Sequence, residues 1–232
     1  MKAVKLDEPW KVACIETEKP VPKEGEALIR IVTAGICGSD IGAFRGTNGL
    51  VTYPRIIGHE LAGVVESIPE NNKNGIKPGD RVVVDPYIYC GHCYPCSIGR
   101  TNCCTDLKVL GVHVDGGMSE YFTHPADLLV NIPEKMNWQE AAMAEPQTNS
   151  LHGIHRGGVK AGEYCAIIGA GPIGLVAGMA AQAYGGHAIL LDLVQERLDF
   201  AKSLGIEHVI NSGKEDAAAK IAEITGGQMA QQ

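Results

Sequence analysis

The strongest constraint on the fold is a glycine-rich turn that lies between an apolar run and an alanine-rich segment. The turn reads Gly169-Ala170-Gly171-Pro172-Ile173-Gly174, a G-x-G-x-x-G pattern. The run at 163–168 predicts a strand before it, and 172–184 predicts a helix that tolerates proline at its first position. A second apolar run, 188–192, ends in Asp192. This order of strand, turn, helix, strand and acid predicts a parallel sheet with a dinucleotide at the turn.

The turn explains how such a ligand would be held. Glycines let the backbone approach a pyrophosphate, and the helix N-terminus offers unpaired N–H groups and a partial positive charge. Asp192 is expected to accept hydrogen bonds from the adenosine ribose and to repel a 2′-phosphate, which favours NAD over NADP. The alternative is a glycine-rich turn without a ligand. The residues expected at the cofactor are Gly169, Gly171, Pro172, Ile173, Gly174 and Asp192.

The rest of the chain predicts a second kind of domain. Its 232 residues, 45% of them hydrophobic, suffice for one large domain or two modest ones. Short β-like runs broken by glycine and proline occur before residue 150, at 27–32, 63–67 and 81–84. We therefore predict a β-rich domain over 1–150 and an α/β domain over 151–232.

The α/β part continues beyond Asp192 with further alternation. Helices are expected at 194–204 and 214–224, with a short strand at 208–210 between them. About three strands supply only the first half of a doubly wound fold, so the nucleotide-binding domain is expected to be incomplete, with an uncovered edge on its first strand.

Charge and hydropathy exclude several classes of protein. The net charge is −7 with acids and bases dispersed, which argues against nucleic-acid binding. The N-terminus lacks the apolar run of a signal peptide, and glycine and proline interrupt the most apolar stretch, 167–183. We expect a soluble, cytoplasmic protein without a membrane partner.

Five of the eight cysteines lie between positions 90 and 104. Clustering in a chain of this size favours a metal site over disulfides. Four of them follow C-x2-C-x2-C-x7-C and suit a closed, structural zinc site: Cys90, Cys93, Cys96 and Cys104. Cys103 is an alternative fourth ligand, and His92 is a competing ligand. An iron–sulfur cluster is disfavoured by the long last gap and by Thr105, where bacterial ferredoxins have proline. Cys14 and Cys165, in apolar contexts, are expected to be buried.

A second metal site is predicted from residues that are unremarkable singly. Cys37, His59, Glu60 and Glu145 all lie upstream of the nucleotide turn. A catalytic zinc needs about three protein ligands and one open position, and cysteine, histidine and a carboxylate supply them. Such a metal lowers the pKa of a bound alcohol, so that hydride can pass to a nicotinamide.

Taken together, these motifs resemble the medium-chain zinc-dependent alcohol and polyol dehydrogenases over essentially the whole chain to about residue 225. The similarity is greatest to the sorbitol and threonine dehydrogenases and to the sugar-acid branch, the L-galactonate and L-gulonate 5-dehydrogenases. The motifs that carry it are the Cys37 segment, Gly58-His59-Glu60-Leu61-Ala62-Gly63, the four cysteines, Asp115-Gly116-Gly117 and the glycine-rich turn. The resemblance implies a GroES-like catalytic domain before a Rossmann-type domain, two zinc ions, NAD, and a homodimer or homotetramer.

The resemblance also implies roles for single residues. Cys37, His59 and Glu145 would surround the catalytic zinc, and Glu60 would bind it directly, through water, or in alternation with substrate. Ser39 would begin the proton relay, with helix capping as the alternative. Phe44 would line the pocket unless it is ordinary core. Arg197 would hold the adenosine ribose unless it is a solvated helix charge.

The sequence departs from the family pattern at three places. Gly42 replaces a relay histidine, for which His152 and His155 are candidates only by residue type. Pro69 replaces a small residue in a surface turn. Relatives are expected to continue for about a hundred residues more, through the nicotinamide half.

We therefore expect an oxidoreductase that transfers hydride between NAD and a secondary alcohol of a polyol or sugar acid. The alternative is a non-catalytic, zinc-stabilised binding or assembly module. A zinc-free quinone reductase relative is disfavoured because it would lack the ligand residues.

Overall fold

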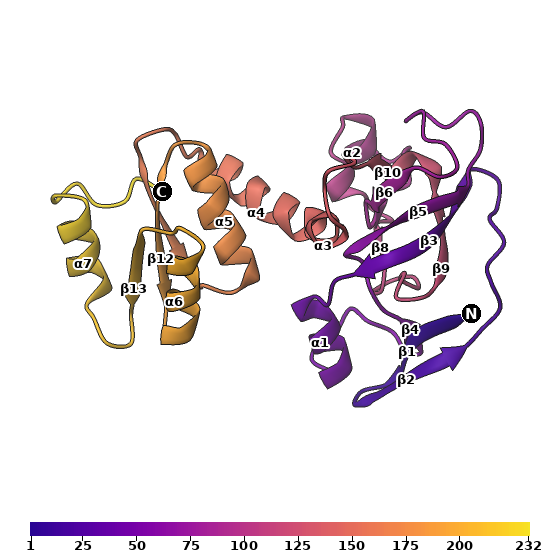
Figure 1. Cartoon of the computed structure of the whole chain (residues 1–232), viewed down its shortest axis with the longest axis horizontal. Coiled ribbons are helices and arrows are strands. Elements are labelled where there is room, and N and C mark those ends of the chain that lie inside the picture. The colour runs from indigo at the N-terminus through magenta and orange to yellow at the C-terminus, as the bar shows by residue number, and fades with distance from the viewer. The chain divides into compact units, whose positions relative to one another are not determined.

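The computed structural model describes all 232 residues, and the chain forms two compact units, Met1–Glu145 and Pro146–Gln232 (Figure 1). The junction between them lies within helix α4 (Ala144–Gly157). The boundary expected from sequence, between 150 and 151, lies in the same helix. Each unit has its own buried apolar cluster.

The first unit is rich in strands, as its short apolar runs indicate. It contains a three-stranded sheet in the order β2-β1-β4, a five-stranded sheet in the order β10-β6-β5-β3-β9, and the pair β7-β8. The strands are β1 (Lys2–Glu8), β2 (Lys11–Glu16), β3 (Glu26–Ala34), β4 (Arg55–Ile56), β5 (Leu61–Ser67), β6 (Arg81–Val84), β7 (Tyr87–Ile88), β8 (Lys108–Val109), β9 (Tyr121–Pro125) and β10 (Leu129–Asn131). Its helical segments are α1 (Gly38–Arg45), α2 (Tyr94–Ser97), η1 (Thr101–Cys103), η2 (Ala126–Leu128) and α3 (Trp138–Ala142).

The five-stranded sheet supplies the core of this unit. Side chains such as Ile29, Val82 and Leu129 are fully buried in it. The sequence runs at 27–32, 63–67 and 81–84 correspond to β3, β5 and β6. Strand β5 pairs with β3 on one side and β6 on the other, so the residues just before β5 lie in the interior of the unit.

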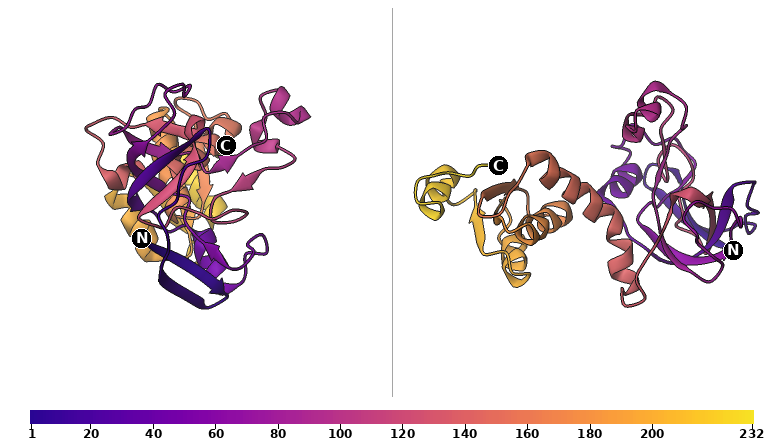
Figure 2. Two further views of the ribbon diagram at one scale, coloured as in Figure 1. Left: turned by 90° about the vertical axis from the view of Figure 1, so that its right-hand side faces the viewer. Right: turned by 90° about the horizontal axis from the view of Figure 1, so that it is seen from above.

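The second unit is a parallel sheet with helices on both faces. Strands β11 (Tyr164–Ile168), β12 (His187–Asp192) and β13 (His208–Asn211) are adjacent in that order. Helices α5 (Pro172–Ala183) and α6 (Gln195–Ser203) share one apolar cluster with the sheet, and α7 (Ala217–Ile224) packs with the cluster on the other face. Figures 1 and 2 show the yellow α7 apart from the orange α5 and α6.

Two sequence expectations for this unit need correction. Helix α7 begins three residues later than expected, because the Asp216 side chain accepts a hydrogen bond from the Ala219 N–H and caps the helix there.

The outer edge of β11, which was expected to be uncovered, is paired with residues 231–232. Gln231 donates its backbone N–H to the Tyr164 carbonyl at 3.0 Å, and the Gln232 carbonyl accepts from the Ala166 N–H at 3.0 Å.

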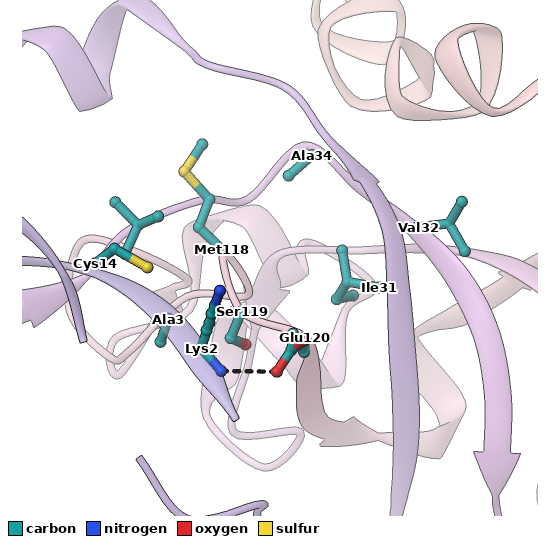
Figure 3. A pocket seen from close by; sticks show the side chains of 10 residues that line it. Lys2, Ala3, Cys14, Ile31, Val32, Ala34, Met118, Ser119 and Glu120 are labelled. Carbon is teal, nitrogen blue, oxygen red and sulfur yellow. Dashed lines mark hydrogen bonds between the residues drawn. The ribbon is translucent and has the colours of Figure 1, made fainter. Parts of the chain in front are cut away.

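The two cysteines expected to be buried behave differently. Cys165 is buried in the central cluster of its unit, whereas Cys14 is exposed, so that expectation is wrong for Cys14. The reason is that β2 is an edge strand. Cys14 borders an open hollow of about 350 Å³ with Met118 and Ala34 among its other lining residues (Figure 3).

None of the helices is both long enough and apolar enough to cross a membrane.

His124, on β9, predicts a pH dependence of stability. Its side chain is 1% exposed, its Nε2 lies 2.8 Å from the Asp85 carbonyl, and its Nδ1 has no partner. Burial lowers the pKa of His124 from 6.5 to about 4, because a second proton would have no acceptor. The unfolded chain therefore binds the proton first as pH falls. The free energy of unfolding should decrease from pH 6.5 downward, by about 3 kcal/mol near pH 4.

Chemical denaturation at several pH values checks this expectation. A His124→Leu chain should show a shallower decrease between pH 6.5 and 4. The matched control is His152→Ala, which alters an exposed histidine and should leave the slope unchanged. Equal slopes for the unchanged and His124→Leu chains would contradict the assignment.

Candidate catalytic and metal sites

Three of the four residues expected at the open metal site come together in the first unit. The ligand atoms of Cys37, His59 and Glu60 all lie within 4.8 Å of one another. His59 and Glu60 are buried, with 6% and 8% of their surface exposed, and Cys37 is half-buried. A thiol, an imidazole and a carboxylate gathered in this way form a donor set that suits zinc.

Local structure explains this convergence. Cys37 is the N-cap residue of α1, which starts directly after the loop that leaves β3. His59 and Glu60 lie immediately before β5, the neighbour of β3 in the sheet. Gly58 has φ +101°, a left-handed conformation that favours glycine, and it turns the chain into this position.

A second segment, 111–118, lies directly against the backbone that carries His59. Gly117 donates its N–H to the Gly58 carbonyl at 3.0 Å, and Met118 donates to the Ile57 carbonyl at 2.9 Å. A Cβ at Gly116 would lie 2.3 Å from the Gly58 carbonyl oxygen, so only glycine permits this approach. The Gly116-Gly117 pair is therefore a packing feature.

The titratable groups of the site perturb one another strongly. The hydrogen bond from the His59 side chain lowers the pKa of the Cys37 thiol against the effect of burial. Burial acts to lower the pKa of His59, but Cys37 and the nearby carboxylates outweigh it, and the net pKa is raised. Burial raises the pKa of Glu60, although His59 opposes this. A buried cation would stabilise both the Cys37 thiolate and the Glu60 carboxylate. The electrostatics of these residues therefore also suit zinc.

Asp40 belongs to this site although the sequence did not single it out. It is 5% exposed, and its carboxylate accepts a hydrogen bond from the Cys37 N–H at 2.8 Å. Its Oδ1 lies 3.8 Å from Nδ1 of His59, a buried nitrogen that has no hydrogen-bond partner. A carboxylate beside one ring nitrogen orients the other toward a metal. The available signal was its position three residues after Cys37, where an acid completes a capping box.

Replacing Asp40 by Asn should weaken zinc binding at the open site by about 10- to 100-fold, the usual cost of changing a residue that orients a metal ligand. The amide keeps the size of the side chain and an oxygen for the helix cap but removes the charge beside His59. Competition with a zinc chelator measures this affinity. Asp7→Asn, at an acid paired with Lys5 on β1, is the control and should bind zinc normally. Unchanged binding in Asp40→Asn would contradict the role.

The other expected residues of this site are less closely grouped. Glu145 lies outside the group of three, and Tyr87 donates its hydroxyl to the Glu145 carboxylate at 3.4 Å. It is near enough for its charge to raise the pKa values of His59 and Glu60. The Ser39 side chain contacts Cys37 from inside α1, so its alternative role as the helix cap is wrong. Phe44 packs against Trp10, with ring centroids 5.1 Å apart.

The residues around Gly42 bear on the missing relay histidine. A Cβ at Gly42 would lie 3.6 Å from the Thr47 hydroxyl and 3.5 Å from the Asn48 Cβ. His155, by contrast, bonds to the Tyr184 hydroxyl at 2.6 Å within the second unit, and His152 is exposed.

The cysteine cluster forms a second group, in a segment that we call the cysteine lobe, residues 90–104. The sulfurs of all four expected ligands lie within 4.8 Å of one another, which suits a tetrahedral zinc whose sulfurs are about 3.8 Å apart. Cys90 donates its N–H to the Cys104 sulfur at 3.3 Å, and Cys93 donates to the Cys90 sulfur at 3.4 Å. Backbone N–H groups aimed at sulfur favour thiolates.

The lobe distinguishes between the alternative ligands. Cys103 is exposed and outside the group, where its sulfur accepts a hydrogen bond from the Asn102 amide. His92 is exposed, and its ring contacts the Cys90 carbonyl at 2.9 Å. Backbone hydrogen bonds lower the pKa of Cys93 to about 6, while burial and the adjacent Cys93 raise that of Cys96 to about 12. Binding a cation here would therefore release protons.

The glycine-rich turn has the geometry that its sequence predicts. Gly169 has φ +103° and follows β11 directly, and Gly171 is the N-cap of α5. A Cβ at Gly174 would lie 1.7 Å from the Gly169 carbonyl oxygen, so α5 can pack against the turn in this way only if residue 174 is glycine. A Cβ at Gly171 would meet nothing within 4 Å. Gly171 therefore borders open space at the helix N-terminus, where a pyrophosphate would approach.

Asp192 ends β12 and fixes the neighbouring loop to this turn. Its carboxylate accepts from the Val194 N–H at 2.9 Å and from the Ala170 N–H at 2.8 Å, and these bonds lower its pKa. Arg197 lies 3.5 Å from the same carboxylate on an exposed side chain. Pro172 opens α5, and Ile173, half-exposed, accepts a hydrogen bond on its carbonyl from Ser150.

Comparison with known proteins agrees with this arrangement. Residues 23–134 match the alcohol dehydrogenase GroES-like domain, and residues 172–232 match the zinc-binding dehydrogenase family. The chain is 53% identical to an uncharacterized zinc-type alcohol dehydrogenase-like protein of Haemophilus influenzae, over 100% of this chain and 68% of that protein. It is 36% identical to the L-galactonate-5-dehydrogenase of Escherichia coli, over 100% of this chain and 67% of that enzyme.

A solved structure shows the same fold with a cofactor. It is the crystal structure of an alcohol dehydrogenase from Escherichia coli CFT073 complexed with NADH, which is 41% identical to this chain. The TM-score is 0.89, over 97% of this chain and 66% of that one. The chain thus spans about two thirds of the length of these relatives. With identity at this level across both units, the chain belongs to the zinc-dependent medium-chain family of alcohol and polyol dehydrogenases.

Proposed function

We propose that this chain carries the zinc sites and the adenosine-binding half of an oxidoreductase. Its reaction would transfer hydride between NAD and a secondary alcohol of a polyol or sugar acid. The observation that supports this most strongly is the buried group of Cys37, His59 and Glu60, with ligand atoms within 4.8 Å of one another. A purely structural metal site would be closed by four protein ligands, whereas three leave a position for substrate.

The residues have separate tasks in this proposal. Cys37 and His59 would hold the catalytic zinc with one carboxylate at a time, from Glu60 or Glu145, so that one position stays open to substrate. Cys90, Cys93, Cys96 and Cys104 would hold a structural zinc. When bound, zinc supplies a Lewis acid that lowers the pKa of a substrate hydroxyl, and NAD accepts the hydride. Asp40 would keep the His59 ring oriented.

Proton movement would begin at Ser39. Its hydroxyl lies beside Cys37, at the first turn of α1. Because Gly42 offers no side chain, the proton would leave through water, with the Thr47 hydroxyl as the nearest polar side-chain group to that position. No second histidine is needed in this route.

The cofactor would bind along the glycine-rich turn. Gly169, Gly171 and Gly174 shape the turn, and Pro172 and Ile173 begin the helix whose N-terminus would face the pyrophosphate. Asp192 and Arg197 would contact the adenosine ribose, so NAD would bind better than NADP.

The substrate class is inferred from the metal ligands and from a relative. The donor set includes a carboxylate, Glu60, and the chain is similar to an L-galactonate-5-dehydrogenase. Both support a polyhydroxy substrate over ethanol. We further propose a cytoplasmic homodimer or homotetramer, as the family resemblance implies, without a nucleic-acid or membrane partner.

Zinc and NAD binding of the purified chain test this proposal. We expect two zinc ions per chain by elemental analysis, saturable NAD binding by calorimetry, and NADH formation with L-galactonate or sorbitol. Cys37→Ser should lose one zinc ion, whereas Cys14→Ser, at the exposed cysteine of β2, should lose none. One zinc ion per unchanged chain, with no NAD binding, would instead favour a zinc-stabilised binding module.

A further inference from the structure

A glycine that carries no chemistry of its own lies against the candidate metal site. Gly35 directly follows β3, and its N–H donates to the Glu60 carbonyl at 2.8 Å. The next pair along the two strands is Ala34 with Leu61. Gly35 and Glu60 are therefore neighbours across the end of the β3–β5 ladder, where side chains on the same face lie close together.

The Glu60 side chain occupies the space that a side chain at position 35 would need. An added Cβ at Gly35 would lie 2.0 Å from Glu60 Oε2, 2.9 Å from its Cβ and 3.1 Å from its Cδ. These distances are well below van der Waals contact. The three nearest atoms all belong to Glu60, so the space beside Gly35 is filled by this one side chain.

Backbone conformation does not account for the glycine. Gly35 is not one of the glycines with a left-handed φ angle, whereas Gly58 is. An alanine would therefore fit the backbone at position 35. What excludes it is the Glu60 side chain, through its Cβ at 2.9 Å and above all through its carboxylate at 2.0 Å. That carboxylate is one of the three groups within ligand distance of one another.

We propose that Gly35 is a positioning residue for the zinc site, because its missing side chain provides the space in which the Glu60 carboxylate stays beside Cys37 and His59. This inference rests on the proposed function, in which these three residues hold zinc. Replacing Gly35 by Ala drives the carboxylate out of the group without altering any ligand residue.

The test measures the release of each zinc ion from the full chain to a colorimetric chelator. The closed cysteine site serves as an internal reference in the same molecule. Gly35→Ala is expected to bind the open-site zinc about 10- to 100-fold more weakly, with the cysteine-site zinc unchanged. Gly38→Ala is the matched control, because a Cβ there meets nothing within 4 Å and Gly38 also has no left-handed φ.

A double-mutant cycle separates positioning of Glu60 from a general disturbance of the fold. Glu60→Gly removes both the carboxylate and the Cβ that the new methyl group would meet, so adding Gly35→Ala to it should weaken zinc binding less than twofold further. An equal loss in both backgrounds, or normal zinc release from Gly35→Ala, would overturn the proposal. If the unchanged chain bound zinc only at its cysteines, the proposed function would fail and this inference with it. If the unchanged chain bound two ions and Gly35→Ala behaved normally, only the inference would fail.

Discussion

A Cys93→Ser chain is expected to hold one zinc ion fewer than the unchanged chain and to lose the ordered structure of its cysteine lobe. The lobe has little else to stabilise it, since neither α2 nor η1 contains a buried residue. Structural zinc contributes on the order of 10 kcal/mol to the folding of small peptides that depend on it. The expected loss is therefore large but local.

Two measurements on one sample check this. Elemental analysis should fall by one zinc ion per chain, and hydrogen exchange should accelerate over residues 90–104. The core of the five-stranded sheet, around Ile29 and Leu129, should keep its protection because its side chains are buried independently of the lobe.

Cys103→Ser is a demanding control for this experiment. It changes the same residue type one position from Cys104, but its sulfur lies outside the ligand group. It should retain two zinc ions and normal exchange. Loss of zinc from Cys103→Ser, or its retention by Cys93→Ser, would show that the ligands are wrongly assigned.

The second large effect is expected at the nucleotide turn, where two glycines should fail in different ways. In Gly174→Ala the new methyl group would lie 1.7 Å from the Gly169 carbonyl oxygen, a backbone atom that cannot rotate away. Overpacking of this severity costs about 3 kcal/mol or more. The melting temperature of the second unit should fall by more than about 10 °C, and NAD binding should be lost with it.

Gly171→Ala should separate binding from stability. The backbone there is extended, with φ −78° and ψ −179°, and the added Cβ meets nothing in the chain. The melting temperature should therefore remain within about 2 °C of that of the unchanged chain. Calorimetry should nevertheless show at least about a tenfold loss of NAD affinity, because the methyl group occupies the path of the pyrophosphate. Normal NAD binding by Gly171→Ala would contradict the placement of the cofactor.

Much of the fold could be predicted because its signals are local. The alternation of apolar strand and alanine-rich helix around Gly169 is contained in about thirty consecutive residues. Each element follows from its hydrophobic periodicity and from the residues that start and end it. The same holds for the cysteine lobe, in which ligand spacing indicated the four residues that the structure gathers but left Cys103 as an alternative to Cys104. The start of α7 was placed too early because the residues before it are also compatible with a helix. The Asp216 side chain caps the helix and sets its first residue.

The open site was harder because it depends on contacts across the sheet. Cys37 and His59 are distant in sequence, and only the pairing of β3 with β5 brings them together. Asp40 was missed because its role depends on a distance of 3.8 Å to His59 that no spacing rule contains. Gly35 was not identified because the residue that needs its space, Glu60, lies 25 positions away in sequence, just before β5. Cys14 was wrongly placed because strand periodicity does not tell an edge strand from a central one.

The close approach of segment 111–118 to Gly58 also has a consequence for how related sequences diverge. A Cβ at Gly111 or Gly116 would meet backbone atoms of Ile57 and Gly58, whereas a Cβ at Gly58 would meet the Met118 side chain at 2.6 Å and its backbone nitrogen at 3.0 Å. A substitution at Gly111 or Gly116 therefore cannot be accommodated by a rotamer change in the segment that carries His59. We expect the two stretches to be inherited together, so that in relatives that lose the metal ligands the glycines at 58 and 116 persist until both segments diverge at once.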